Sequence, residues 1–329
     1  MIDCNSLACK CEMPIRFDSY SGCSHACKYC FVRKYSDLDK ISAYKCVSEL
    51  RNFIAGKRNV NTKWCDWNIP LHWGGVSDPF QKLERAKRIS FECLKVFAET
   101  EYPFVVSTKG TVLTDHDYLA LLRQCNAVVQ ISMISPKYDA IEPGAPTYAE
   151  RLKMIPTLVA NCKRVNVRYQ PYMREVFKDA VGRLKDLKAA GVHGVIVEGL
   201  VAGKKRPGMI PTGGGKYVYT PDALIDDFLA IKNECHRLGL VFYCADDALR
   251  ELGDFTCCCG TEGLEGFKTN SFTASNIALG LKVEPPTEKM KEIGTARCFR
   301  NRESTDEIRL RNSSFFEETR RFAQKMMQL

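Results

Sequence analysis

Three cysteines near the N-terminus have a spacing that could hold an iron–sulfur cluster. Cys23, Cys27 and Cys30 lie within eight residues, with gaps of three and two residues between them. A loop of this kind can wrap one corner of a cubane, each thiolate on a different iron, so that the fourth iron has no protein ligand. Zinc sites instead present paired CxxC knuckles or histidine partners. The spacing therefore predicts a [4Fe–4S] cluster with one open iron.

Further cysteines gather before this loop and near the end of the βα pattern. The chain has 17 cysteines, and in the cytoplasm clustered cysteines suggest metal ligation or catalysis rather than disulfides. In a barrel the two segments could approach each other and supply a second Fe–S cluster or a zinc ion; free thiols packed under a loop are the alternative. The candidates are Cys4, Cys9, Cys11, Cys244, Cys257, Cys258 and Cys259.

The elements that must position these residues alternate along the chain. Short apolar runs alternate with amphipathic helical stretches, which predicts a parallel sheet with right-handed crossovers and the chemistry at the carboxyl ends of its strands. Expected strands cover residues 15–20, 68–76, 103–107, 127–132, 164–169, 193–198 and 239–244. Expected helices cover residues 83–99, 114–125, 147–161, 176–190 and 221–238. Roughly six βα units predict an α/β fold, a partial (β/α)6-type barrel.

The regions outside this alternation of strands and helices indicate how the chain is divided into segments. We expect a Cys-containing N-terminal segment over residues 1–14, the barrel over 15–245, and a Cys-bearing, mainly helical extension over 246–329. Residues 38–62 look like a helical insertion. Residues 200–219, rich in Gly, Pro and Lys, predict a long mobile loop.

Composition and charge are those of a soluble globular protein. Of 329 residues, 45% are hydrophobic and 26% charged, no run approaches the ~20 apolar residues of a membrane span, and the start of the chain does not read as a secretory signal. We therefore expect a cytoplasmic location and no membrane association. A net charge of +9 suits a polyanionic partner such as DNA or RNA, but alone it is weak evidence.

The sequence resembles radical S-adenosylmethionine (SAM) enzymes, in particular the subgroup related to spore photoproduct lyase. Tyr29 supplies the aromatic residue before the last cluster cysteine. The resemblance implies a radical SAM barrel in which the open iron chelates the amino and carboxylate groups of SAM. An electron from a partner such as flavodoxin or ferredoxin then yields a 5′-deoxyadenosyl radical that abstracts hydrogen from the substrate. The matching segments are residues 18–35, 77–85, 107–109, 131–132, 142–146 and 151–152.

The same resemblance implies residues that contact SAM. Ser77 and Lys109 resemble those that hold its carboxylate and nearby polar groups, and a lysine that ends an apolar strand would be unpaired unless it met an anionic ligand; it could instead snorkel to solvent. Asp78 could bind the amine or ribose of SAM, or cap the next helix. The remaining candidates are Tyr29, Ser132, Arg168 and Glu198.

Two of these candidates have specific roles to weigh. Arg168 could bind a carboxylate or a substrate anion through its planar fork, or form a surface salt bridge. Glu198 ends a late strand similar to the one whose backbone passes the adenine of SAM, and its carboxylate could accept a hydrogen bond from a ribose hydroxyl.

Departures from the lyase pattern predict a different substrate. The cysteine that in the lyase returns hydrogen to the substrate radical corresponds to Gly75, and the tyrosine after the last cluster cysteine corresponds to Phe31. We expect lyase, isomerase or transferase-type radical chemistry on a nucleobase, nucleotide or nucleic acid. One alternative is an enzyme that modifies a peptide or small molecule with an auxiliary cluster. Another is a nucleic-acid-binding protein with structural metal sites.

Overall fold

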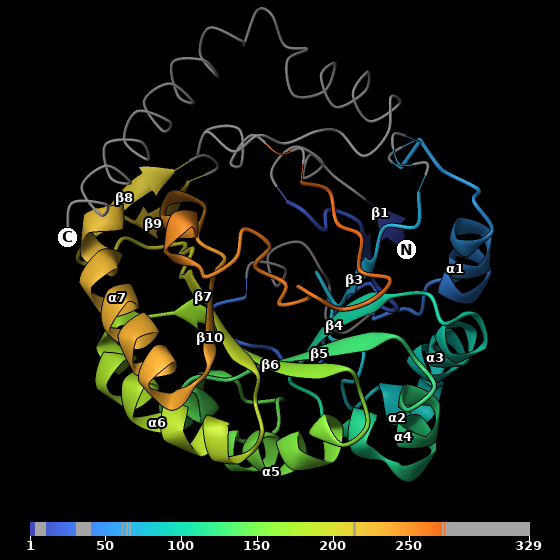
Figure 1. Ribbon diagram of the computed structural model, residues 1–329, viewed down its shortest axis with the longest axis horizontal. Coiled ribbons are helices and arrows are strands. Elements are labelled where there is room, and N and C mark those ends of the chain that lie inside the picture. Colours follow the sequence, from blue (N-terminus) through green and yellow to red (C-terminus); the bar gives the residue numbers. More distant parts are fainter. Residues whose placement is uncertain are drawn as a thin grey trace, which may run out of the picture.

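One curved sheet organises the computed structural model, which describes residues 1–3, 11–30, 41–60, 62–63, 65, 67–212, 215–271 and 273. In this part of the chain eight strands pair in the order β1-β2-β3-β4-β5-β6-β7-β10, and Figure 1 shows them curving inside an arc of helices. Only β1 is antiparallel to its neighbour; all the others pair in parallel. The strands are β1 (Ile2–Asp3), β2 (Arg16–Phe17), β3 (Leu71–Trp73), β4 (Phe104–Thr108), β5 (Ala127–Ser132), β6 (Arg164–Tyr172), β7 (Gly194–Gly199) and β10 (Val241–Cys244). The predicted α/β partial barrel is confirmed.

Helices cover the outer face of this sheet, and local sequence fixes where several of them begin. Thr147 and Glu150 form a reciprocal capping box at the start of α5, while the Thr220 hydroxyl caps α7 and Pro221 occupies its first turn. The helices are α1 (Cys46–Ile54), α2 (Glu84–Lys87), α3 (Ile89–Thr100), α4 (His116–Leu122), α5 (Tyr148–Val159), α6 (Phe177–Ala189) and α7 (Pro221–Leu238).

An aromatic cluster joins the first half of the sheet to its helices. The rings of Phe97 and Phe104 stack with centroids 4.1 Å apart, and Trp73 lies 5.5 Å from Phe97. All three side chains are completely buried. Because interiors of this kind are close-packed, the cluster fixes β3 and β4 and therefore the polar residues that follow them.

The inner face of the sheet is filled by a different part of the chain. After β10 the chain continues through the 3-10 helix η7 (Asp247–Leu252) and runs back across the interior, the orange segment of Figure 1. There Cys257, Cys258, Cys259 and Phe267 pack with inward-facing Val105, Val128, Ile196 and Tyr243 in a small apolar cluster. The barrel interior is therefore plugged by the segment that follows its last strand.

Three expectations about individual elements need correction or stay untested. Residues 200–219 contain an antiparallel hairpin, β8 (Met209–Thr212) with β9 (Lys216–Tyr219), where a mobile loop was expected. The helix expected over residues 83–99 is interrupted at Arg88, whose φ is +52°. The described start of the expected helical extension holds only η7, and residues 274–329 lie outside the described residues. The division into three segments stays a prediction.

None of the helices in the described part of the chain has both the length and the apolar character that a bilayer crossing requires.

Candidate active site

A cavity of about 400 Å³ opens at the carboxyl ends of the parallel strands, where α/β barrels gather their chemistry. The residues predicted to hold a cluster and SAM come from the cluster loop (residues 23–30) and from the ends of β3 to β7, yet all of them line this one cavity. They are Cys23, Cys27, Tyr29, Cys30, Ser77, Asp78, Lys109, Ser132, Arg168 and Glu198. Folding therefore brings together every residue that the sequence proposed for this site.

The cluster loop is anchored on two sides. On one side the Ser24 amide donates to Oε1 of Gln81 (2.6 Å), and Nε2 of Gln81 donates to the carbonyl of Gly22 (3.0 Å). On the other side the Lys28 amide donates to the carbonyl of Ile141 (2.8 Å). Because these anchors follow β3 and β5, the barrel itself determines where the loop lies.

The thiols of the loop suit a polynuclear cluster. Burial raises the pKa of Cys23 to about 12 and that of Cys27 to about 11, although the charge of Lys109 acts against burial at Cys27. A metal therefore displaces protons when it binds. Among the described residues, no three His, Cys, Asp or Glu side chains are already arranged around a single ion. A [4Fe–4S] cubane differs from a single ion because each of its thiolates binds a separate iron. Three thiols in one wall of a cavity, beside polar groups, fit this requirement.

Asp78 organises the wall next to the loop. Its carboxylate accepts hydrogen bonds from Thr108 Oγ1 (2.7 Å) and the Lys109 amide (2.6 Å), and it pairs with Nε2 of His25 (2.9 Å). Burial opposes ionisation, but the charge and hydrogen bond of His25 and the bonds from β4 lower the pKa of Asp78 to about 2. Asp78 also accepts from the Phe80 amide (2.9 Å), so it joins the cluster loop to two strand ends. Nothing in the sequence pattern indicated a role for His25, although it lies inside the cysteine motif.

The strand-end serines are held by charged residues that face them. The amides of Val76 and Ser77 both donate to Oδ1 of Asp18, at 3.0 and 2.9 Å, and the Ser77 hydroxyl lies 3.3 Å from the same oxygen. The carbonyl of Ser132 accepts from Nη1 of Arg151 at 2.7 Å. Both serines are therefore placed by backbone contacts as well as by their strands.

Lys109 has a protein partner, which corrects the argument that it would be unpaired without an anionic ligand. Its Nζ lies 3.8 Å from Oε1 of Glu142, a carboxylate that is 2% exposed. The Tyr29 hydroxyl donates to Glu142, and Nη2 of Arg151 lies 2.7 Å from its other oxygen. Glu142 belongs to a matching segment of the sequence, but its partner Lys109 is too far away in the chain for a pattern to reveal the pair.

A polar network crosses the interior from the cavity toward the plug. The Ser107 hydroxyl lies 2.9 Å from Nε2 of His72 and donates to Oε1 of Gln130 (2.9 Å). Nη1 of Arg168 donates to the same oxygen (2.9 Å), and Nη2 lies 3.4 Å from Glu198. Arg168 is only 7% exposed, whereas the side chain of Glu198 is 30% exposed, so the pair lies at the rim of the cavity and the anion-binding role of Arg168 stays a prediction.

Arg16 and His72 are cavity residues that the sequence did not indicate. A Cβ atom at Gly75 would lie 2.8 Å from Cδ of Arg16, so the arginine occupies the space beside Gly75. Burial, followed by the charges of Arg168 and Arg16, lowers the pKa of His72 to about 3. The imidazole is therefore neutral at physiological pH, between two guanidinium groups. Both residues lie in short strands, and the sequence of a short strand does not show which of its side chains face the cavity.

The candidate residues for a second metal site are only partly described. Cys4, Cys9 and also Phe31 lie outside the described residues. Cys11 lines the cavity and packs against the apolar cluster that contains Cys257, Cys258 and Cys259. Cys244 is buried at the end of β10.

A second depression, the basic groove, adjoins the cavity. It has a volume of about 360 Å³, lies between the cluster loop and the β8–β9 hairpin, and shares Tyr29, Cys30, Leu200 and Val201 with the cavity wall. Four of its lining residues carry positive charge: Lys28, Lys204, Arg206 and Lys216. Arg206 pairs with Glu175 at 3.0 Å. A positively charged surface thus leads to the cluster loop.

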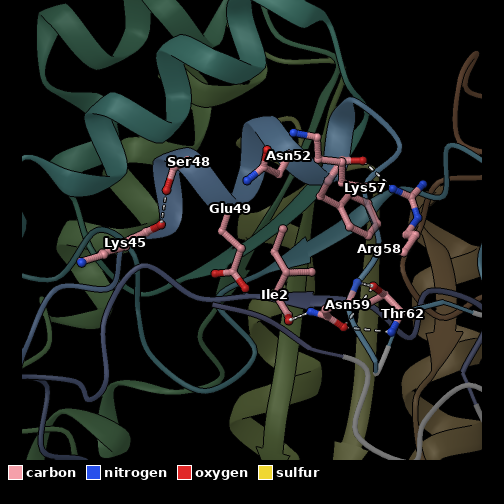
Figure 2. A pocket seen from close by; sticks show the side chains of 10 residues that line it. Ile2, Lys45, Ser48, Glu49, Asn52, Lys57, Arg58, Asn59 and Thr62 are labelled. Atoms are coloured by element: carbon pink, nitrogen blue, oxygen red, sulfur yellow. Dashed lines mark hydrogen bonds between the residues drawn. The ribbon is translucent and has the colours of Figure 1, made fainter.

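The depression in Figure 2, of about 430 Å³, lies apart from this site, between α1 and the N-terminal strand. Two of its polar side chains have protein partners: Asn59 donates to the carbonyl of Ile2 (3.1 Å), and the Ser48 hydroxyl donates to that of Lys45 (3.1 Å). No cysteine lines it. The chemistry therefore belongs to the cavity at the strand ends.

Comparison with known sequences gives distant relatives. No family model matches the chain. Uncharacterized proteins of Mycobacterium tuberculosis and Mycobacterium bovis are 26% identical over 202 residues, which cover 57% of this chain and 59% of theirs. An uncharacterized protein of Methanocaldococcus jannaschii is 22% identical over 148 residues, 44% of this chain and 54% of that protein. The match thus spans little more than half the length of these relatives.

Comparison with solved structures identifies the fold. Spore photoproduct lyase complexed with dinucleoside spore photoproduct aligns with a TM-score of 0.57 at 14% identity, over 74% of this chain and 79% of the lyase. A lyase variant with bound AdoMet and dinucleoside spore photoproduct aligns with a TM-score of 0.54 at 13% identity, over 72% and 77%. The chain shares the fold of spore photoproduct lyase.

Proposed function

We propose that this protein is a radical SAM enzyme that holds a [4Fe–4S] cluster on Cys23, Cys27 and Cys30 and cleaves SAM reductively. The lining of the cavity is the observation that supports this proposal most directly. One wall presents the three thiols, and the adjoining walls present every residue that resembles a SAM contact. When bound, the cluster and SAM supply a carbon radical that abstracts hydrogen from a substrate. A flavodoxin or ferredoxin is the expected electron donor.

The roles of this chain's own residues follow from their contacts. Lys109 lines the cavity and is ion-paired with Glu142 at 3.8 Å. Because Glu142 shares its charge with Arg151, Lys109 can also attract a carboxylate that binds in the cavity. The Asp78 carboxylate holds the Lys109 amide and the His25 ring, and is a positioning residue for the loop and for β4. Glu198 lines the same cavity, where it could accept a hydrogen bond from a ribose hydroxyl.

For the substrate we propose a nucleotide or a nucleic acid. The basic groove supports this, because lysine and arginine side chains attract phosphate groups and the groove shares Tyr29 and Cys30 with the cavity. The lyase structures that share the fold contain dinucleoside spore photoproduct. Gly75 has no thiol that could return hydrogen to a product radical, so the proposed reaction differs from the repair of a thymine dimer.

Isotope transfer tests the substrate. The reduced, cluster-loaded protein is incubated with SAM and, separately, with deuterated DNA or RNA, nucleotides, or peptides, and deuterium in 5′-deoxyadenosine is measured. We expect label from the nucleic acid or nucleotide pool. Label from peptides alone would contradict the proposed substrate and favour the alternative of a peptide-modifying enzyme, which the cysteines of the barrel plug support.

Charge reversal in the groove gives an independent test. Lys204→Glu places a negative charge in the basic groove, and Lys57→Glu makes the same change in the remote depression of Figure 2. We expect Lys204→Glu to weaken oligonucleotide binding about tenfold and to reduce its salt dependence. Equal effects of the two variants would contradict a role for the groove.

A further inference from the structure

We infer that the Arg16 guanidinium and the His72 imidazole together bind the lactam edge of a nucleobase, the adjoining C=O and N–H of a base such as uracil or guanine. The arginine donates to the carbonyl oxygen, and the histidine accepts from the ring N–H. The kind of substrate comes from the proposed function, on which this inference rests. Both side chains line the cavity that contains the cluster thiols.

The two side chains lie next to each other on the inner face of the sheet. Arg16 in β2 and His72 in β3 are register partners in two parallel strands, and such partners point to the same face of a sheet. A Cβ atom at Gly75 would lie 2.8 Å from Cδ of Arg16. The absence of a side chain at Gly75 therefore leaves room for the arginine beside His72.

A chain of hydrogen bonds that begins at the barrel plug fixes the tautomer of His72. Nε2 of Gln130 lies 2.8 Å from the carbonyl of Cys259, which can only accept, and Oε1 lies 2.9 Å from Nη1 of Arg168, which can only donate. These partners determine which end of the Gln130 amide is the oxygen. The Ser107 hydroxyl lies 2.9 Å from that oxygen and must donate its proton to it.

His72 consequently has an unused acceptor. Because the Ser107 hydroxyl donates to Gln130, it accepts from Nε2 of His72 at 2.9 Å, and Nε2 carries the ring proton. Burial, followed by the charges of Arg168 and Arg16, lowers the pKa of His72 to about 3, so the ring holds no second proton at neutral pH. Nδ1 is therefore an acceptor, and within the described part of the chain no group donates to it.

Arg16 supplies the complementary donors. Across the described residues its guanidinium makes one hydrogen bond, a long contact of 3.5 Å from Nη2 to Oδ2 of Asp3. Nε is buried and has no partner there, which is unfavourable for a polar group out of contact with water. The side chain as a whole is 20% exposed, so a ligand in the cavity can reach the guanidinium. Unused donors and an unused acceptor thus lie side by side.

This arrangement suits a base better than a peptide. A base presents its donor and acceptor side by side on one edge, and enzymes that act on extruded bases bind them through that edge. In a trans peptide bond the N–H and C=O point in opposite directions, so one peptide unit cannot meet Arg16 and His72 together. The basic groove next to the cavity offers positive charge to the attached phosphates.

Methylated ligands test the recognition of the ring N–H. We measure equilibrium binding of UMP, GMP, 3-methyl-UMP, 1-methyl-GMP, CMP and AMP to the cluster-loaded protein in the presence of SAM. We expect UMP or GMP to bind most tightly, and its methylated counterpart to have a Kd at least about tenfold higher, because methylation removes the donor without adding charge. N-acetylalanine methylamide, a trans peptide unit, should not compete.

Substitutions test the two side chains. His72→Gln keeps a donor for Ser107 but loses the acceptor at Nδ1, whereas His72→Asn places its amide oxygen there. We expect His72→Gln to raise the Kd for the preferred nucleotide about tenfold and to abolish the preference over the methylated form, and His72→Asn to stay within about threefold of wild type. Arg16→Met should also raise the Kd about tenfold. Arg51→Met, at an exposed arginine paired with Glu99, should leave it unchanged.

Formation of 5′-deoxyadenosine by the wild type, measured in the same preparations, separates this inference from SAM cleavage. Product without selective nucleotide binding, equal Kd values for methylated and unmethylated nucleotides, or an undiminished preference in His72→Gln would overturn the inference and leave SAM cleavage intact. Tighter binding of CMP or AMP, or competition by the peptide unit, would also overturn it. Selective binding without product would instead contradict SAM cleavage and support the recognition pair. Far-ultraviolet circular dichroism checks that variants are folded; where one is not, the methylation comparison in the wild type decides.

Discussion

A Cβ atom at Gly75 would lie 2.8 Å from Cδ and 3.1 Å from Cγ of Arg16. The contact involves the stem of the arginine, between neighbouring parallel strands β2 and β3, so the guanidinium cannot simply swing aside. The position that resembles the hydrogen-donating cysteine of the lyase is therefore packed against a charged side chain. The absence of a thiol at position 75 and the packing of the Arg16 side chain against that position therefore occur together.

Replacing Gly75 should be costly. We expect Gly75→Ala to lower the free energy of unfolding by about 1–3 kcal/mol through overpacking, and Arg16→Ala to relieve part of that cost in the double variant. Gly182→Ala is the control, because nothing lies within 4 Å of a Cβ there and alanine favours a helix. Urea denaturation measures the wild type, the two single variants, the double variant and Gly182→Ala; equal effects at both glycines would refute the packing argument.

Removing the charge of Asp78 should destabilise the site. Asp78→Asn breaks a buried pair with His25, which typically costs about 3–5 kcal/mol. Asp117, in an exposed pair with Arg88, is the control, and Asp117→Asn should cost at most about 1 kcal/mol. Because the pKa of Asp78 is lowered to about 2, its contribution is present above pH 3.8 and is lost as the pH falls through about 2. The difference in stability between wild type and Asp78→Asn should therefore shrink as the pH falls from 3.8 toward about 2, and a difference that does not shrink over that range would contradict the assignment.

His72 predicts a pH dependence of the same sign, but in the mildly acidic range. Its folded pKa is lowered to about 3, so below pH 6.5 the unfolded chain binds a proton that the folded chain does not. Stability should fall by up to about 1.4 kcal/mol per pH unit as the pH drops from 6.5 toward 3. His72→Asn should lack this component. Urea midpoints of both proteins at pH 7.5, 6 and 5 test the difference; parallel pH profiles would show that His72 is not held neutral.

Lys109 should contribute to SAM affinity. We expect Lys109→Met to raise the Kd for SAM about tenfold, equivalent to about 1.4 kcal/mol, because it removes the cation that faces the cavity. Lys95→Met, at an exposed lysine paired with Glu92, should leave the Kd unchanged. Equilibrium binding to the cluster-loaded protein measures both. An unchanged Kd for SAM in Lys109→Met would show that the lysine pairs only with Glu142 and does not contribute to SAM binding.

The sequence predicted the strands whose apolar runs are long, because burial on both faces leaves a continuous signal, as in β5. It missed the β8–β9 hairpin, since most of its residues are exposed or half-buried and its Gly and Pro content is typical of loops. The fold and the lining of the cavity could be predicted from a family resemblance. The partners could not: Glu142 beside Lys109 and Arg16 beside Gly75 are long-range contacts, and no local pattern encodes them.

The most direct test of the central claim is formation of 5′-deoxyadenosine. Wild-type protein and Cys30→Ala, each reconstituted anaerobically and reduced with dithionite, are incubated with SAM, and the product is quantified by chromatography and mass spectrometry. We expect 5′-deoxyadenosine from the wild type and none above background from Cys30→Ala. A wild-type protein that holds a reducible [4Fe–4S] cluster and binds SAM, yet forms no 5′-deoxyadenosine with or without nucleic acid, nucleotide or peptide substrates, would contradict the account.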